Sequence, residues 1–188
     1  MSRSDAVKSG SVTEKKLSRL EGNITKAYVA AQNLGKNRIT VPGNAKVGTK
    51  DTQVSGNRLV MAMQDTRLSV DNRHKIESNG LENPNAWASA GPSEITFWKN
   101  GLNPPRYDVS TVQQHIAIHE MLHMIPQLRG WEVSEAARQQ HQEPFKNAVE
   151  QALILRGNRD FERREEYEQF LAALLRRRNA GRRERFAQ

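Results

Sequence analysis

The chain has 188 residues, 27% of them charged and 36% hydrophobic, which is enough for one domain with its own core. It contains no cysteine, which excludes disulfide bonds and thiolate metal ligands. The formal net charge is +8, which favours contact with anionic partners, and no apolar run reaches the ~20 residues of a membrane span. Residues 1–12 are polar and rich in small residues, so we expect a disordered segment there and a single domain over residues 13–188.

The first half of the chain predicts helices and short strands. Leu17, Leu20, Ile24 and Tyr28 recur at helical spacing, and Gly35 is a natural C-terminal stop. The expected elements are a helix over residues 12–34, a strand at 38–41 followed by a glycine-rich turn region, a helix at 57–66, a possible strand at 74–78, a long loop at 79–94 and a strand at 94–99.

The second half predicts mainly helices. Ser110 is a plausible N-cap for a helix that runs to Ile125, and this helix is apolar on nearly all sides, which is typical of a buried central helix. Further helices are expected over SEAARQQHQ (134–142) and over PFKNAVEQALILR (144–156), with Pro144 in a first turn. A last amphipathic helix is expected over residues 160–179. The fold class expected from this order of elements is α+β.

The letters HEMLH in the central helix are the HExxH pattern. His119 and His123 lie four residues apart, so both imidazoles can reach one ion, while Glu120 points about 100° away around the helix. This pattern predicts two zinc ligands and a general base that removes a proton from a zinc-activated water. His115 lies about 12 Å along the axis from His123, too far to share the ion, so we expect it to be a packed residue or one that contacts the ligands without binding the ion.

The third ligand must come from elsewhere in the chain. The extension HExxHxxGxxH is absent, because Pro126 and Arg129 occupy the glycine and histidine positions. The last expected helix carries several glutamates, and Glu166 lies at the edge of its apolar stripe, so helical phase favours Glu166. The alternatives are Asp160, Glu162 and Glu165.

Upstream of the central helix, the strand expected at 94–99 is in the right place to act as an edge strand. In proteases of this kind, such a strand pairs with the extended substrate through backbone hydrogen bonds. The alternative is an ordinary core strand.

Taken together, residues 94–188 resemble the zincin metalloproteases that bacteria inject as type III effectors, of the NleD and XopG type. That group is similar in motif order to the light chains of clostridial neurotoxins. The matching features are a proline-containing lead-in (NPPRYDVST), HEMLH, Gly130 after it, a glutamate pair within REEYEQF, and an arginine-rich end.

The resemblance implies a compact single-domain zincin with a small sheet, the central HExxH helix and a C-terminal glutamate-bearing helix. It implies Zn²⁺ held by His119, His123 and Glu166, with Glu165 beside the ligands. An Arg-x-x-Tyr pattern that stabilises the oxyanion in the neurotoxin-like proteases corresponds to Arg183 and Phe186. Phenylalanine has no hydroxyl, so Tyr167 and Tyr107 are the alternatives.

The resemblance also implies a zinc-dependent endopeptidase whose N-terminal residues 1–12 act as a secretion segment. Such a protein is secreted without a cleaved signal peptide, injected into the host cytosol as a virulence factor, and active there on a host protein. A monomer is expected. Two alternatives stay open. One is a non-enzymatic basic protein that binds nucleic acid or an acidic partner. The net charge and the arginine-rich residues 176–186 favour this alternative. The other is a zincin fold without proteolytic activity.

Overall fold

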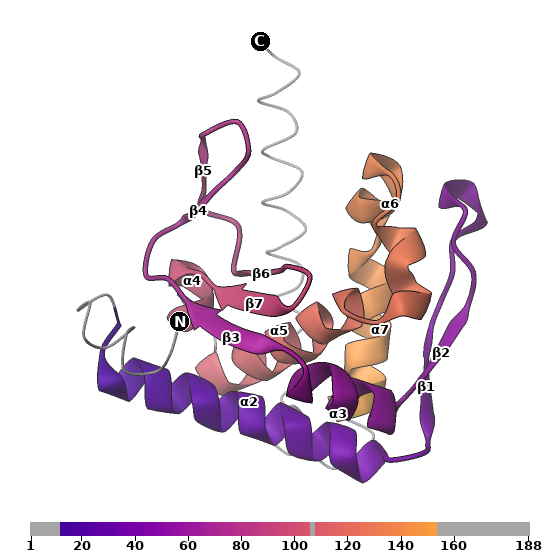
Figure 1. Ribbon diagram of the computed structural model, residues 1–188, viewed down its shortest axis with the longest axis horizontal. Coiled ribbons are helices and arrows are strands. Elements are labelled where there is room, and N and C mark those ends of the chain that lie inside the picture. Colours follow the sequence, from indigo (N-terminus) through magenta and orange to yellow (C-terminus); the bar gives the residue numbers. More distant parts are fainter. Residues whose placement is uncertain (1–11, 106–107, 154–188) are drawn as a thin grey trace.

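The computed structural model describes residues 12–105 and 108–153. Helices and small sheets mix along the chain and pack around one hydrophobic core, so the expected α+β class is confirmed (Figure 1). The helices are α2 (Glu14–Leu34), α3 (Gly56–Gln64), α4 (Lys99–Leu102), α5 (Val109–His123), α6 (Glu135–Gln140) and α7 (Gln142–Leu153), with short 3-10 turns at Ala45–Val47 and Pro126–Trp131. The strands are β1 (Arg38–Val41), β2 (Thr52–Ser55), β3 (Arg67–Val70), β4 (Lys75–Ile76), β5 (Glu82–Asn83), β6 (Ala88–Ala90) and β7 (Glu94–Phe97).

Helix α2 forms along the stretch that the sequence predicts. The Thr13 side chain accepts a hydrogen bond from the Lys16 backbone N–H and caps its start, and Gly35 ends it at a positive φ of 56°. Its buried stripe packs against α3 and α5, and α2 lies along one side of the molecule in Figure 1. Helix α2 therefore supports the central helix α5.

Helix α5 is buried along its length, as predicted, because every residue from Thr111 to Leu122 is enclosed by the surrounding elements. Its boundaries differ from the prediction. Asp108, not Ser110, is the N-cap and accepts hydrogen bonds from the Thr111 backbone N–H at 2.7 Å and hydroxyl at 2.8 Å. The last helical residue is His123 rather than Ile125. The Ser110 hydroxyl instead donates to Asn23 and accepts from Gln114, both at 2.9 Å, so it is not used as the cap.

The sheets are smaller and more numerous than expected. Strands β3, β7 and β6 form one sheet in that order, with β3 parallel and β6 antiparallel to β7. Two hairpins, β1–β2 and β4–β5, complete the strands of the described residues. Three strands, β2, β5 and β6, lie where the sequence predicts turns and loops, because pairing with a neighbour overrides the weak strand preference of these short polar segments.

Strand β7 is the middle strand of its sheet, so the prediction that residues 94–99 form the edge strand is wrong. Its residues Ile95 and Phe97 are buried in the core, which is the ordinary alternative considered for this strand. Among the residues that the structure describes, the edge of this sheet next to α5 is β6. Alanine and serine give β6 little strand signal of its own, and it forms by pairing with β7.

The last helix expected from the sequence, over residues 160–179, lies outside the described residues. The same holds for the N-terminal residues 1–11. In the described residues, no helix is long and apolar enough to span a membrane.

Candidate metal centre

Three histidine side chains from two parts of the chain converge at the end of α5. His119 and His123 come from successive turns of α5, and His141 lies between α6 and α7. The Nε2 atoms of His119 and His141 are 3.1 Å apart, and those of His119 and His123 are 3.3 Å apart. One ligand atom from each of the three lies within 4.8 Å of the others, so the group could hold a metal ion.

These separations fit a common ion. Two nitrogens bound to zinc at about 2.05 Å with tetrahedral angles are about 3.3 Å apart. Neutral imidazole nitrogens that face one another without hydrogen repel, so a shared proton or a cation would stabilise this arrangement. A three-histidine set leaves room for a further ligand, and in catalytic zinc sites that position holds water or substrate.

The outer nitrogens of two ligands are held by acceptors. His123 Nδ1 donates to the carboxylate of Glu132, and His141 Nδ1 donates to the backbone carbonyl of Arg138. Each Nδ1 is therefore the protonated nitrogen, which leaves Nε2 as the lone pair that faces the cluster. Such outer partners fix the ring orientation before any ion binds.

Glu132 and Arg138, the two residues that provide these acceptors, are hydrogen-bonded to each other. One guanidinium nitrogen of Arg138 donates to the backbone carbonyl of Glu132 at 2.9 Å, and the same guanidinium pairs with Glu135 at 3.2 Å. The segment 132–141 thereby forms a closed loop that carries His141 and holds His123 through Glu132. The Ser134 side chain caps α6 within this loop by accepting from the Ala137 backbone N–H at 3.1 Å.

Buried apolar contacts support the rings from the core side. The Phe145 ring lies with its centroid 5.3 Å from that of His119 and 4.9 Å from that of His123. Its own side chain is fully buried, and Trp131 packs behind it with ring centroids 6.3 Å apart. His119 is buried, whereas His123 and His141 are half-buried, so the cluster lies at the boundary between core and solvent.

Glu120 is buried beside the cluster. Burial raises the pKa of its carboxyl above the ordinary value, although the nearby His123 and a hydrogen bond from the backbone of Ala90 act in the opposite direction. A carboxylate whose pKa is raised towards neutrality is a better proton acceptor for catalysis. Ala90 belongs to β6, so the edge strand directly contacts the predicted base.

Burial and charge also set the protonation of the ligands. Burial and the neighbouring histidines keep the pKa of His119 well below its ordinary value. For His123, burial opposes the charged form, but the hydrogen bond that its Nδ1 donates to Glu132 and the charges of Glu120 and Glu132 outweigh it, and the pKa is raised. The same hydrogen bond, accepted from His123, holds the pKa of the Glu132 carboxyl below its usual range.

His115 stays outside the cluster, as predicted. Its ring centroid is 5.8 Å from that of His119, one turn further into the core. Complete burial, helped by the charge of Lys146, lowers its pKa to about 3, so it is a neutral packed residue at neutral pH. It does not belong to the three histidines whose ligand atoms converge.

The remaining residues predicted for the site lie outside the described residues. They are Tyr107, Asp160, Glu162, Glu165, Glu166, Tyr167, Arg183 and Phe186. Glu166 as a zinc ligand therefore stays a prediction.

Sequence reasoning missed His141 and Glu132. His141 lies eighteen residues beyond His123 in a polar helical stretch, and its spacing matches no recognised extension of HExxH. The available signal was scarcity: the chain has only five histidines, and this one had no other assigned role. Gln142 was also missed; its side-chain amide nitrogen is 3.1 Å from His141 Nε2, so a hydrogen-bond donor lies beside the cluster.

Comparison with known protein families, with curated proteins and with solved structures found no match in any of the three.

Proposed function

We propose that this chain is a zinc-dependent endopeptidase in which His119, His123 and His141 hold the ion and Glu120 is the general base. The observation that carries the proposal is the convergence of three histidine nitrogens next to a buried glutamate of an HExxH helix. When bound, zinc supplies Lewis-acid polarisation of a carbonyl and lowers the pKa of water to about 7. Copper, nickel and cobalt also accept imidazole ligands, so zinc is the choice favoured by HExxH rather than by the histidines alone.

Glu120 and Gln142 have separate roles in the proposed reaction. Glu120 accepts the proton of the water that attacks the scissile carbonyl, and returns it to the amine that leaves. Burial favours the protonated carboxyl, so Glu120 can hold that proton between the two steps. The Gln142 amide can donate a hydrogen bond to the developing oxyanion, which is the role the resemblance gives to Arg183 and a tyrosine.

Strand β6 supports a peptide as the substrate. It is the edge of its sheet on the side of α5, and it contacts Glu120 through Ala90. An extended peptide that pairs with β6 gains backbone hydrogen bonds and lies along the helix that carries the base. The resemblance to injected effectors extends the proposal to a host protein as the substrate, delivered into the host cytosol without a cleaved signal peptide.

The test measures bound zinc and peptide hydrolysis in the same samples. Wild type is expected to bind one zinc per chain, His119→Ala to lose it, and Glu120→Gln to keep it while hydrolysis of a mixed peptide library falls by about 10²-fold or more. His74→Ala is the matched control, because this histidine pairs with Glu82 on the β4–β5 hairpin, away from the cluster. A folded wild type without zinc would reject the metal centre, and undiminished hydrolysis by Glu120→Gln would reject the base.

A further inference from the structure

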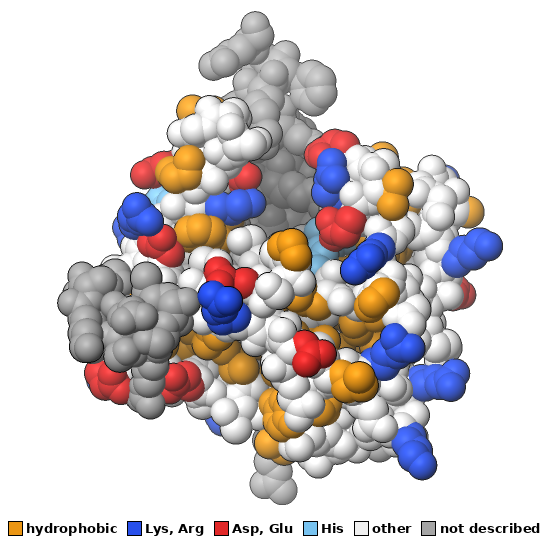
Figure 2. All heavy atoms as spheres, in the orientation of Figure 1, with side chains coloured by type: hydrophobic (Ala, Val, Ile, Leu, Met, Phe, Trp, Pro, Cys, Tyr) orange, Lys and Arg blue, Asp and Glu red, His pale blue; other side chains and the backbone are white. Residues whose placement is uncertain are grey.

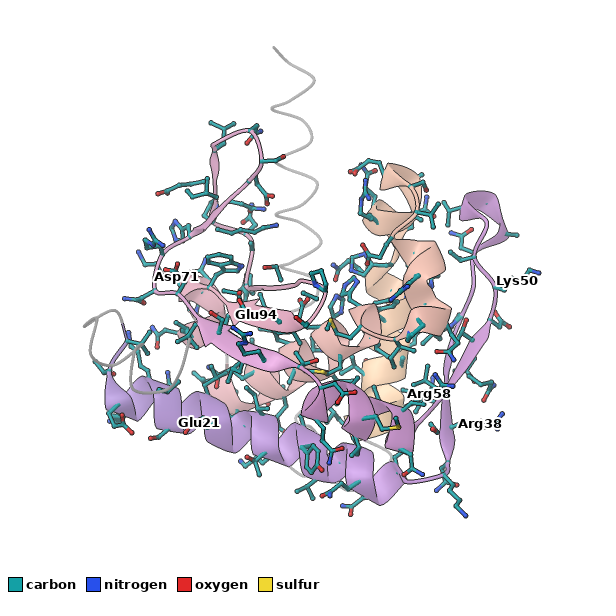
Figure 3. All side chains as sticks on the ribbon, in the orientation of Figure 1. Glu21, Arg38, Lys50, Arg58, Asp71 and Glu94 are labelled. Carbon is teal, nitrogen blue, oxygen red and sulfur yellow. The ribbon has the colours of Figure 1, made fainter. Side chains whose placement is uncertain are left out.

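A second surface, away from the histidines, carries concentrated positive charge. Residues 36–58 include five cations and one acid, and they form β1, β2 and the first turn of α3. We call this surface the basic hairpin; its cations are Lys36, Arg38, Lys46, Lys50 and Arg58. All five side chains are exposed. Figure 3 shows Arg38, Lys50 and Arg58 on the same side of the molecule, and Figure 2 shows basic side chains along that side.

The described part of the chain leaves most of this charge uncompensated. None of the five cations forms an ion pair with another described residue. The one acid, Asp51, accepts a hydrogen bond from the Gly43 backbone N–H at 2.7 Å, so it serves to shape the loop between the strands. An uncompensated group of cations raises the local concentration of an acidic partner.

The hairpin also has an open edge. On one side, β1 is closed by Gln151 of α7, whose side chain accepts from the Thr40 backbone N–H at 2.9 Å and donates to its carbonyl at 3.1 Å. The backbone N–H and C=O of Thr40 thus point away from β2, towards α7. In an antiparallel pair its cross-strand partner Gln53 must then point its own N–H and C=O away from β1. No other strand of the described residues pairs with β2, so these groups face outward at an edge flanked by the cations.

The chemistry of the surface selects the class of partner. Residues 36–58 contain no aromatic side chain, whereas binding of single-stranded nucleic acid uses aromatic stacking. The exposed large apolar side chains of the described chain all lie outside residues 36–58, at Val29, Met61, Ile76, Leu81 and Val133, so the hairpin itself has no such group to insert into a lipid surface. An open strand edge with positive charge fits an extended acidic polypeptide.

We propose that the basic hairpin docks an extended, acidic protein segment along the open edge of β2. The hairpin contacts the segment that carries His141, because the Asn44 side-chain amide donates to Gln140 at 2.5 Å and Gln140 directly precedes His141. A segment of about six residues, or about 17 Å, spans the edge from Lys50 to Ser55. That this segment belongs to a substrate held for cleavage rests on the proposed function; the docking itself does not.

The test uses a fluorescent peptide of about eight residues that alternates glutamate and threonine, and measures its anisotropy. The full chain carries Glu120→Gln so that cleavage cannot change the probe. We expect saturable binding that weakens at least about tenfold when the salt is raised to about 0.5 M. The triple variant Arg38→Glu/Lys50→Glu/Arg58→Glu should weaken binding by at least about tenfold as well.

The matched control reverses three exposed cations on other elements. Lys15→Glu/Arg67→Glu/Lys99→Glu changes the net charge by the same amount on α2, β3 and α4, and should weaken binding by less than about twofold. Two further peptides carry N-methyl groups on alternate amides, one on the odd-numbered and one on the even-numbered residues. Both keep their charge, but at least one should bind more weakly, because methylation removes backbone hydrogen-bond donors.

Absence of binding by the acidic peptide would overturn the proposal, as would equal losses of binding in the two triple variants. Undiminished binding of both methylated peptides would do the same. So would tighter binding, at the same cations, of a ~20-nucleotide single-stranded DNA or of phosphatidylserine vesicles. Because the assay needs neither metal nor hydrolysis, its failure leaves the endopeptidase proposal intact. Loss of zinc or of hydrolysis would equally leave the docking intact.

Discussion

The carboxylate of Glu132 accepts a hydrogen bond from Nδ1 of His123, while Nε2 of the same ring faces His119. Glu132 follows the 3-10 turn after α5, nine residues beyond the histidine that it holds. A ligand that is already oriented and in the correct tautomer loses less freedom when an ion binds. This pair therefore connects the loop after the central helix to the affinity of the metal centre.

Removing the Glu132 carboxylate should weaken zinc binding without abolishing it. Glu132→Ala is expected to lower zinc affinity by about 10–100-fold, the range found for outer partners of metal ligands. Glu132→Gln should lose less, because its amide oxygen still accepts from Nδ1. Competition with a chromogenic chelator measures the affinity. Glu94→Ala removes an exposed carboxylate that pairs with Arg67 on the sheet, and its affinity should match wild type; an equal loss there would contradict a specific role for Glu132.

Replacing His141 should cost more than replacing Glu132. His141→Ala removes a ligand nitrogen that lies 3.1 Å from that of His119, so we expect a loss greater than about 100-fold in zinc affinity. Glu166→Ala in parallel tests the ligand favoured by the sequence. If Glu166→Ala loses zinc and His141→Ala keeps it, the three-histidine centre is wrong and the neurotoxin-like ligand set is right.

Zinc affinity should fall with acidity, and Glu132 should set where the fall occurs. The ion binds neutral imidazole, so protons compete best at the ligand whose pKa is raised, which is His123. Affinity should drop as the pH falls through a value above 6.5, the ordinary pKa of histidine. In Glu132→Gln the pKa of His123 is lower, so the drop should move to more acidic pH. Chelator competition between about pH 5.5 and 8 measures this shift; unchanged midpoints would contradict the assignment.

The burial of His115 should make the metal-free protein sensitive to acid. Its pKa is about 3 when folded and near 6.5 when unfolded, so between these values the unfolded chain binds more protons. Stability should then fall as the pH decreases, by about 1.4 kcal/mol per pH unit from this group. His115→Gln should reduce that slope in urea titrations of metal-free protein. An identical slope in the variant would show that His115 is not the group responsible.

Close packing of α3 on α2 should make Gly56 intolerant of a side chain. A Cβ at Gly56 would collide with the backbone at Ala31 and Gly35, so Gly56→Ala is expected to destabilise the fold by about 2 kcal/mol or more. Gly22→Ala is the matched control. Its Cβ would meet nothing within 4 Å on the exposed side of α2, so it should stabilise by up to about 1 kcal/mol. Thermal unfolding measures both, and a neutral Gly56→Ala would contradict the close approach.

The sequence by itself determined the elements that strong local signals specify. Helical periodicity and Gly35 defined α2, and the continuous apolar surface of α5 predicted its burial. The i, i+4 spacing of His119 and His123 was enough to pair them, because a helix fixes their relation without tertiary contacts. The same geometry correctly separated His115 from the cluster.

Only the tertiary structure decided what depends on distant segments. Strands β2 and β6 have little preference of their own and exist through their partners, which is why β6 rather than β7 became the edge beside Glu120. His141 reaches the centre because α7, which begins directly after it, folds back against α5, and no spacing rule along the chain encodes that return. Local helix geometry brought two histidines of the candidate metal centre together, and long-range packing added the third histidine and the carboxylate that orients one of the pair.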